Sequence, residues 1–462
     1  MRVRDNTTRP EERSPTLCMQ PKRGGSGDCD VANNSESDQD AAAEALTLCA
    51  KQEPAFRFYA LYDKVSRADM LSHAYDLVRS NRGAPGIDGV TFAAIEAGIG
   101  KDAYVAQLQV ELEQKTYRAD GVRRVWIPKP DGSERPLGIP TIRDRIVQMA
   151  LKLVVEPIFE ADFCEHSYGF RPKRSAHDAV KAVTDGLFQG KTQVIDADLS
   201  KYFDTIPHAK LMAVVAERVV DGGVLALIQQ WLKAPVIEED QQGKRRPSGG
   251  KGNRKGTPQG GVISPLLANL YLHLLDRIWE RHDLERRLGA RLVRYADDAV
   301  ILCRGDSQPA MAVLETVLER LELTLNRDKT RVVDAREQAF NFLGFRIKRA
   351  RSRRTGKAYP HVEPSKRAEQ RIKARIKELT ARRRTPVPMP QMIKEVNQVL
   401  RGWSGYFHYG NCTKVLGRVR WFTEERVRTQ LRRRHQVRTR TRGYERFSYA
   451  HLHDVLGLFK LP

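Results

Sequence analysis

The chain has 462 residues, enough for about three domains of roughly 150 residues each, and 40% of them are hydrophobic. Its 80 Lys and Arg residues outnumber 57 Asp and Glu residues, and the net charge of +23 indicates a polyanionic partner, most often nucleic acid, although a solubility surface or an anionic membrane would also suit it. The six cysteines form no Cys-x-x-Cys pair, which argues against a zinc ribbon. No apolar run reaches the roughly 18 residues of a membrane span, so we expect a protein without a membrane partner.

The first part of the chain predicts a disordered arm followed by a helix and a turn-rich loop. Residues 1–52 are rich in Ser, Asp, Asn, Gly and Arg and have little to bury, so we expect them to be disordered. We expect order from residue 53 onward. Apolar spacing over 68–80 predicts a helix, and the segment NRGAPGIDG at 81–89 predicts two glycine-bounded bends.

The middle of the chain alternates strand and helix patterns. Residues 123–140 predict two short strands around a Pro-Asp-Gly turn, an apolar stripe from 142 to 154 predicts a helix, and 193–200 predicts a strand that ends in charged residues. The stretch 241–256 lacks large apolar side chains and carries six basic ones, so we expect a flexible basic loop. Residues 265–282 predict a helix whose apolar side is nearly continuous.

The character of the sequence changes after about residue 350. Residues 365–384 hold nine basic and two acidic residues in a helical pattern, and the segment TPVPMP at 385–390 ends it. A second amphipathic helix is expected next, and residues 431–446 then carry seven arginines and one Glu. We therefore expect two ordered parts, residues 53–350 and residues 351–462.

Two adjacent aspartates interrupt the apolar segment RLVRYADDAVILC. The apolar residues on both sides predict two buried strands joined by a short turn, which would put Asp297 and Asp298 at a hairpin tip. Charges in apolar surroundings are costly unless they are paired or bound to a metal ion. Carboxylates are good ligands for Mg²⁺, so we prefer this interpretation to a helix cap or a solvated turn.

A phosphoryl-transfer site needs at least one further carboxylate. Asp198, at the end of the predicted strand VIDADLS, is the best candidate. Asp196 lies one pleat earlier on the same face, and Asp204 in KYFDTI is a second helper. Three carboxylates can hold two metal ions about 3.5–4 Å apart, which activate an attacking hydroxyl and stabilise the leaving pyrophosphate oxygen.

Several motifs, in chain order, resemble those of reverse transcriptases. The palm motifs of that family resemble DADLSKYFDTIPH, KGTPQGGVISPLLANLYLHLLD, YADD, LNRDKTRV and FLGF. Three further segments resemble bacterial group II intron reverse transcriptase/maturases more narrowly: IPKPDGSERPLGIPTIRDRIVQ, SYGFRPKRSAHDAV and RGWSGYFHYG. The resemblance covers about residues 56–460.

This resemblance implies an α+β fold: a right-hand polymerase, with fingers and a palm built on an antiparallel sheet, followed by a helical thumb and maturase region. It implies an RNA-directed DNA polymerase that extends a DNA primer on an RNA template, using dNTPs and two Mg²⁺ ions, for which Mn²⁺ could substitute. The protein would also bind its group II intron RNA to promote splicing, and would support mobility into target DNA. It would be a bacterial cytoplasmic protein associated with RNA and the nucleoid.

The resemblance also assigns roles to single residues. Asp198 and Asp297 would be catalytic metal ligands, with Asp298 in support. Phe203 would be a steric gate against a 2′-hydroxyl group, with an ordinary core aromatic as the alternative. Lys129 and Arg135, with Arg123, would bind the triphosphate, or else belong to a solvated hairpin. Gln259 would contact nucleotide or template, and Lys329 would protonate the pyrophosphate or be a plain surface lysine.

Further roles concern nucleic acid. NRGAPGIDG resembles a fingers loop that grips template and primer, and Tyr168, Phe170 and Arg171 would position template or nucleotide, with packing as an equal alternative for the two aromatics. The aromatics of GWSGYF would pack their helix or stack on RNA bases. Because seven guanidinium groups have no obvious internal use, we expect phosphate contacts from the C-terminal arginines, which include Arg432, Arg433, Arg434, Arg438, Arg440 and Arg442.

One departure from many relatives is the absence of an HNH-like nuclease cluster up to Pro462. We expect this chain to lack an endonuclease domain, so its primer would come from elsewhere, such as a nascent strand at a replication fork. Two other functions stay open: a standalone or domesticated reverse transcriptase with no splicing role, and an RNA-binding splicing cofactor with a vestigial polymerase.

Overall fold

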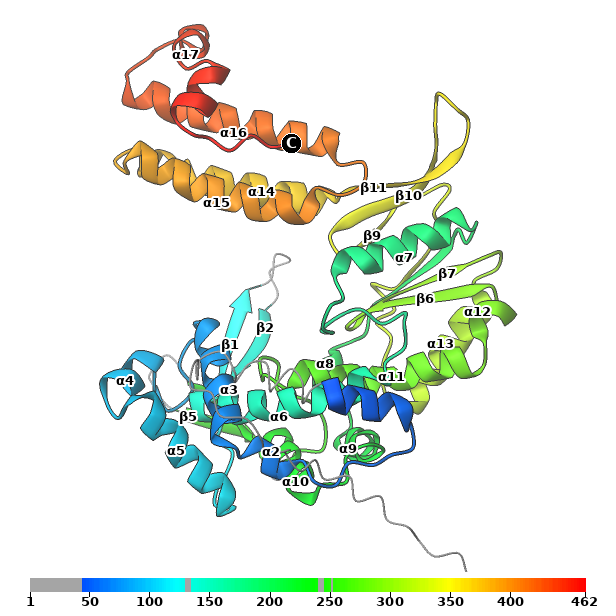
Figure 1. The fold of residues 1–462 in the computed structure, drawn as a ribbon. Coiled ribbons are helices and arrows are strands. Elements are labelled where there is room, and N and C mark those ends of the chain that lie inside the picture. Colours follow the sequence, from blue (N-terminus) through cyan, green and yellow to red (C-terminus); the bar gives the residue numbers. More distant parts are fainter. Residues whose placement is uncertain (1–43, 129–133, 240–244, 251) are drawn as a thin grey trace, which may run out of the picture.

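Three sheets and a set of packed helices form the computed structural model, which describes residues 44–128, 134–239, 245–250 and 252–462 (Figure 1). A mixed sheet and an antiparallel sheet, whose strands alternate along the chain, are followed by a small hairpin sheet and a helical region. This is the expected α+β architecture, with a helical part after the mixed part.

The antiparallel sheet, which we call the palm sheet, has the strand order β6-β7-β3-β8. Its strands are β3 (Gln193–Ala197), β6 (Ala290–Tyr295), β7 (Asp298–Cys303) and β8 (Arg331–Asp334). Successive residues of β7 enter different cores, since Ala299 and Ile301 belong to one buried cluster and Val300 and Leu302 to another. Helix α7 (Ala176–Phe188) covers one face, and α11 (Ser264–Arg281) lies below the other in Figure 1. Burial on both faces explains the apolar run around YADD.

The fingers sheet has the order β2-β1-β4-β5. Strands β1 and β4 run parallel, and the other neighbouring pairs are antiparallel. The strands are β1 (Val122–Pro128), β2 (Glu134–Ile139), β4 (Pro235–Glu239) and β5 (Arg245–Gly249). Besides the helical residues 44–52 and α7, the helices before α11 are α2 (Tyr62–Val65), α3 (Ala68–Ser80), α4 (Phe92–Ala97), α5 (Gly100–Glu113), α6 (Ile142–Glu160), α8 (Tyr202–Thr205), α9 (His208–Ala216) and α10 (Gly222–Leu232). After α11 come α12 (Leu284–Arg287) and α13 (Gln308–Arg320).

A three-stranded sheet leads from the palm into the C-terminal helices. It contains β9 (Phe340–Phe342), β10 (Phe345–Arg351) and β11 (Ala358–Pro364) in the order β11-β10-β9. Ser365 then caps the next helix by accepting a hydrogen bond from the backbone N–H of Ala368. The helical elements are α14 (Lys366–Leu379), η1 (Arg382–Arg384), α15 (Met389–Phe407), α16 (Thr413–Arg434), α17 (Arg440–Arg446) and η2 (His451–Val455). Figure 1 shows α14, α15 and α16 side by side, and they share a third core.

Three expectations differ from the structure. Residues 44–52 are helical and Ala50 is buried, so the prediction of disorder up to residue 52 is wrong for this segment, while residues 1–43 lie outside the described residues. Part of the expected flexible loop forms β5, because its backbone pairs with β4 although its side chains are exposed. The expected boundary at residue 350 falls inside β10, whose hairpin continues to Pro364.

The helices in the described part of the chain are too short or too polar to cross a lipid bilayer.

Candidate active site

The palm sheet brings three of the predicted aspartates to one edge. Ala197 of β3 lies opposite Ala299 of β7 at the end of their antiparallel pairing. The same register places Asp198, the residue after Ala197, beside Asp298, the residue before Ala299. Tyr295 pairs with Asp298 across the β6–β7 turn, and Asp297 lies in that turn. Acidic residues from separate segments therefore meet at the strand ends, as the sequence predicted.

The electrostatics of these carboxylates show that they interact. Burial, followed by the charges of Asp297, Asp198 and Asp196, raises the pKa of Asp298 to about 6, although part of its side chain reaches solvent. Burial and the charge of Asp198 likewise raise the pKa of Asp196 to about 6. The pKa of Asp297 is also raised by burial and by Asp198, against the opposing charge of Arg135. Such crowding fits a site for divalent cations, because a cation would relieve the repulsion.

Asp204, the second predicted helper, does not join this group. It is exposed in α8 and is not among the charges that raise the three pKa values. The residue before it, Phe203, is buried, and its carbonyl accepts a 2.7 Å hydrogen bond from the backbone N–H of Thr257. Phe203 therefore lies in the core next to the TPQGG segment, and its role as a steric gate stays a prediction.

The segment LNRDKTRV is held against the end of β3. The backbone N–H of Asp198 donates to Oγ1 of Thr330 at 3.3 Å, and its carbonyl accepts from Asn326 at 2.8 Å. These bonds place Nζ of Lys329 at 3.6 Å from Oδ2 of Asp198. Lys329 thus lies beside the carboxylates, where a proton donor to a leaving pyrophosphate would be needed.

Strand β2 of the fingers sheet contributes a cation to the same region, and the TPQGG loop before α11 contributes an amide. Nε of Arg135 in β2 donates to Oε1 of Gln259 at 2.9 Å, and the charge of Arg135 acts on Asp297. The backbone of Gln259 also accepts a 2.5 Å hydrogen bond from the N–H of Gly138. Arg123 in β1 is partly buried, and its Nε has no hydrogen-bond partner among the described residues. Lys129 lies outside the described residues, so its predicted role stays a prediction.

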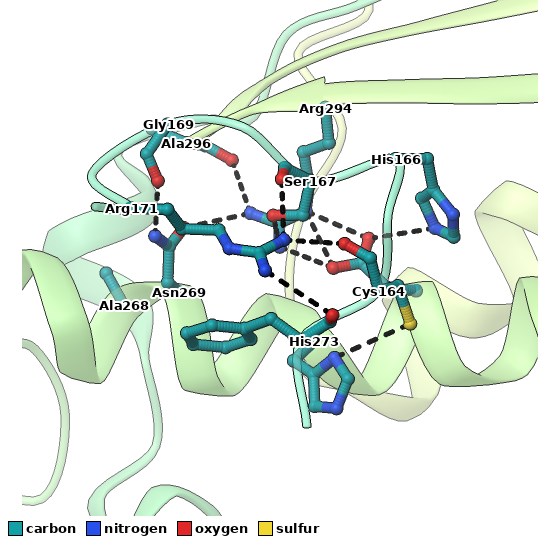
Figure 2. A network of polar contacts seen from close by, with 12 residues as sticks. Cys164, His166, Ser167, Gly169, Arg171, Ala268, Asn269, His273, Arg294 and Ala296 are labelled. Atoms are coloured by element: carbon teal, nitrogen blue, oxygen red, sulfur yellow. Dashed lines mark hydrogen bonds and ion pairs between the residues drawn. The ribbon is translucent and has the colours of Figure 1, made fainter. Parts of the chain in front are cut away.

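A buried arginine that the sequence analysis did not select holds the turn that carries Asp297. Arg294 is 0% exposed, and its guanidinium donates to Asp276, Asn269, Ser167 and the carbonyl of Ala296, as Figure 2 shows for the labelled residues. The bond to Ala296 measures 2.9 Å, and Ala296 has a positive φ of 56°. Arg294 therefore fixes an otherwise unfavourable backbone conformation directly before Asp297.

The segment SYGFRP packs against the same turn. The backbone N–H of Tyr168 donates to the carbonyl of Arg294 at 2.8 Å, and Asn269 Nδ2 donates to the carbonyl of Gly169 at 2.5 Å. A Cβ on Gly169 would lie 2.3 Å from the backbone nitrogen of Ala296, so only glycine fits there. Arg171 is buried and donates hydrogen bonds to Glu160 and to two loop carbonyls. These internal bonds favour a structural role for Arg171 over the predicted contact with template or nucleotide.

The aromatic side chains of GWSGYF pack inside the protein. The hydroxyl of Tyr406 donates to the carbonyl of Leu343 at 2.9 Å, and the rings of Tyr406 and Phe407 contact Phe345. Trp403 packs on Phe407 with ring centroids 5.0 Å apart. These contacts favour packing over base stacking and join α15 to the hairpin sheet.

The C-terminal arginines divide into two groups. Arg432, Arg434 and Arg440 donate hydrogen bonds to backbone carbonyls or to Glu425, so the expectation that all these guanidinium groups lack an internal use is wrong. The side chains of the other three are exposed and form no hydrogen bond or ion pair within the described chain; these are Arg433, Arg438 and Arg442.

Comparison with known proteins identifies two matched regions. Residues 127–347 match a family model described as reverse transcriptase (RNA-dependent DNA polymerase). Residues 369–448 match a model described as group II intron, maturase-specific domain. The first region contains the carboxylate site, and the second covers most of the helical part.

Individual known proteins are also similar to this chain. Protein YkfC of Escherichia coli is 37% identical over 345 residues, which are 67% of this chain and 88% of that protein. The group II intron-encoded protein LtrA of Lactococcus lactis is 30% identical over 365 residues, which are 65% of this chain and 59% of LtrA. Among solved structures, a telomerase from Candida albicans has a TM-score of 0.42 and 12% identity, covering 76% of this chain and 68% of that one.

Proposed function

This chain belongs to the group II intron reverse transcriptases, RNA-directed DNA polymerases that carry a maturase domain, and from that membership we propose that it copies RNA into DNA by two-metal nucleotidyl transfer at Asp198, Asp297 and Asp298. The observation that carries this proposal is the mutual charge repulsion of aspartates from two separate segments at one sheet edge. Polymerases of this kind generally use divalent metal ions, and carboxylate oxygens are the ligands that Mg²⁺ prefers.

In the proposed mechanism the aspartates hold two Mg²⁺ ions, with Mn²⁺ as a substitute. When bound, the ions supply activation of the primer 3′-hydroxyl and stabilisation of the leaving pyrophosphate. Lys329, at 3.6 Å from Asp198, donates a proton to the pyrophosphate. Arg135 and Arg123, with Lys129, bind the triphosphate of the incoming dNTP.

Two further contacts would select the substrate. Gln259, which now accepts from Arg135, exchanges this bond for one to nucleotide or template. The ring of Phe203 lies under the incoming sugar and excludes a 2′-hydroxyl group.

Primer extension on an RNA template tests the polymerase proposal. Asp297→Asn should reduce the rate by at least about 10³-fold while leaving binding of the template–primer largely intact, because the carboxylate acts in the chemical step. Asp102→Asn, which removes an exposed carboxylate in α5, is the matched control and should extend at the wild-type rate. An Asp297→Asn variant with normal extension would refute the site.

The maturase domain implies binding of intron RNA, and we propose that residues 351–462 bind the host intron, promote its splicing and support its insertion into target DNA. The exposed arginines Arg433, Arg438 and Arg442 support this proposal, because each can contact a phosphate without breaking an internal bond. The polymerase in residues 53–350 would then copy the inserted intron.

A triple substitution of these arginines by Ala tests the RNA-binding surface. It should weaken intron RNA binding at least tenfold at moderate salt and reduce the salt dependence of binding, while extension on an unrelated template is unchanged. Arg351→Ala with Arg353→Ala and Arg354→Ala, three exposed arginines at the tip of the β10–β11 hairpin, is the charge-matched control. An equal loss in both variants would mean that only total charge matters. Normal intron splicing by the triple variant would favour a standalone polymerase.

A further inference from the structure

A cluster of sulfur, nitrogen and oxygen donors lies beside the buried Arg294 network and takes no part in the proposed polymerase chemistry. Cys164 and His166 belong to the loop after α6, and Glu280 lies near the end of α11. One ligand atom from each of the three residues lies within 4.8 Å of the other two. His166 Nδ1 lies 3.5 Å from Oε1 of Glu280. Thiolate, imidazole and carboxylate are the donors that Zn²⁺ and related ions take in proteins.

The surroundings of His166 resemble those of a metal-bound histidine. Its Nε2 is buried, has no hydrogen-bond partner in the described structure, and lies 3.6 Å from Oδ1 of the fully buried Asp276. A carboxylate behind the second ring nitrogen commonly orients a histidine whose first nitrogen binds a metal ion. With Nε2 directed to Asp276, Nδ1 is left to face Glu280.

The thiol of Cys164 is similarly fixed. Its sulfur lies 3.8 Å from Nδ1 of His273 in α11, and both residues are visible at the lower right of Figure 2. Cys164 is buried, and its carbonyl accepts from Arg171 at 2.6 Å. The loop backbone is therefore held, and only small side-chain rotations are needed to bring the donors around one ion.

A cavity of about 510 Å³ gives this cluster access to solvent. His166 and Glu280 line it together with Glu165, Asp283 and Glu285, which is an unusual density of acidic groups in a chain of net charge +23. The last three each form an ion pair with Arg or Lys. Glu280, within the described chain, forms no ion pair with a Lys or Arg. Its charge is thus available to an ion, and water from the cavity can complete the coordination.

We infer that Cys164, His166 and Glu280 bind one transition-metal ion of the zinc class, with a cavity water as fourth ligand. The ion would tie the loop after α6 to the end of α11. Ser167, the residue after His166, accepts a 2.6 Å hydrogen bond from Arg294. Metal binding would therefore stabilise the loop that packs against the YADD turn, outside the carboxylate site.

Binding of Zn²⁺ and Co²⁺ to the purified full chain tests this inference. Wild-type protein, stripped with chelator and reloaded, should retain one Zn²⁺ per chain after dialysis. Co²⁺ should produce a thiolate-to-metal charge-transfer band, which the aspartates of the polymerase site cannot give because they contain no sulfur. Asp297→Asn should keep this band.

Variants separate the three ligands from unspecific binding. Cys164→Ser should lose the band, whereas Cys412→Ser, a buried cysteine in the helical part, should keep it. Glu280→Gln changes a side chain that is 54% exposed, so the fold should survive, and Co²⁺ affinity should fall at least about tenfold. Absence of the band in wild-type protein, or wild-type affinity in Glu280→Gln, would overturn the site.

Discussion

The substitution Arg294→Met removes the guanidinium beneath the YADD turn while keeping a long side chain. Arg294 and Asp276 form a doubly hydrogen-bonded ion pair whose side chains are 1% and 0% exposed. Removing one partner of a buried pair costs about 3–5 kcal/mol, because the other charge is left buried. The carbonyl of Ala296 and the amide oxygen of Asn269 also lose a donor, at about 1 kcal/mol each.

The expected total of about 5–7 kcal/mol is a large part of the roughly 5–15 kcal/mol that holds a domain folded. It should lower the unfolding temperature by roughly 10–28 °C at about 2–4 °C per kcal/mol. Arg277→Met is a matched control one residue after Asp276: its ion pair with Glu217 is 49% exposed on both sides and should contribute at most about 1 kcal/mol. Thermal unfolding followed by circular dichroism measures both variants.

The pH dependence gives a second test. In the wild type, Arg294 holds the pKa of Asp276 well below its usual range against the opposing effect of burial, so the stability from this pair is present above the unfolded pKa and is lost only in strong acid. In Arg294→Met, only His166 still opposes the effect of burial, so this pKa rises, and the deficit should shrink as the pH falls and Asp276 takes up a proton. Adding Asp276→Asn should likewise restore part of the loss. A deficit under about 1 kcal/mol, or one that is independent of pH, would refute the reasoning.

Two other predictions concern the carboxylate site. Gly169→Ala should slow primer extension roughly 10–100-fold, because the added Cβ would displace Ala296 and with it Asp297. Gly402→Ala, whose added Cβ meets open space, is the control and should extend primers normally. Equal extension rates in the two variants would contradict the close contact between Gly169 and Ala296. Asp196→Asn should stabilise metal-free protein at pH 8 by up to about 3 kcal/mol, since the folded pKa of about 6 makes the ionised carboxylate costly. Urea unfolding in chelator should show this gain shrinking as the pH falls from 6 to 4, and a gain that persists at pH 4 would exclude the charge as its cause.

The parts of the structure that follow from local pattern were predicted well. Alternation and apolar runs located β3, β6 and β7, and the register of these strands brought Asp198 beside Asp298 as expected. The two basic and amphipathic patterns after residue 365 became α14 and α15. Periodicity carries such information because each face of a strand or helix must match what it packs against.

The Arg294 network could not be predicted in the same way. Its members come from the loop after α6, from α11 and from β6, and only the tertiary fold brings them together. The available signal was a charged residue inside each apolar segment, Arg294 in RLVRYADD and Asp276 in the helix 264–281. Two opposite charges buried in separate apolar elements suggest a pair, since neither could be buried alone.

The prediction that the C-terminal arginines have no internal use was wrong for the same reason, because their partners lie in distant parts of the chain. Counting charges in residues 431–446 treated each guanidinium as free, but Arg434 donates to the carbonyls of Arg384 and Val387 and so fixes the turn between α14 and α15. Carbonyls left open at helix ends need donors, and arginine is long enough to reach them. A basic cluster near helix termini therefore contains structural arginines as well as those that face RNA.

The carboxylate site and the Arg294 network depend on each other. Asp196, Asp297 and Asp298 all have raised pKa values, so these carboxylates destabilise the fold when they are charged and no cation neutralises them. Repulsion of this kind would tend to open the β6–β7 turn, where Ala296 already has a positive φ. Two contacts hold this turn from behind: the hydrogen bond from the guanidinium of Arg294 to Ala296 and the close approach of Gly169. The buried ion pair thus opposes the strain that the proposed two-metal chemistry would impose, because it keeps Asp297 in place whether or not a cation is bound.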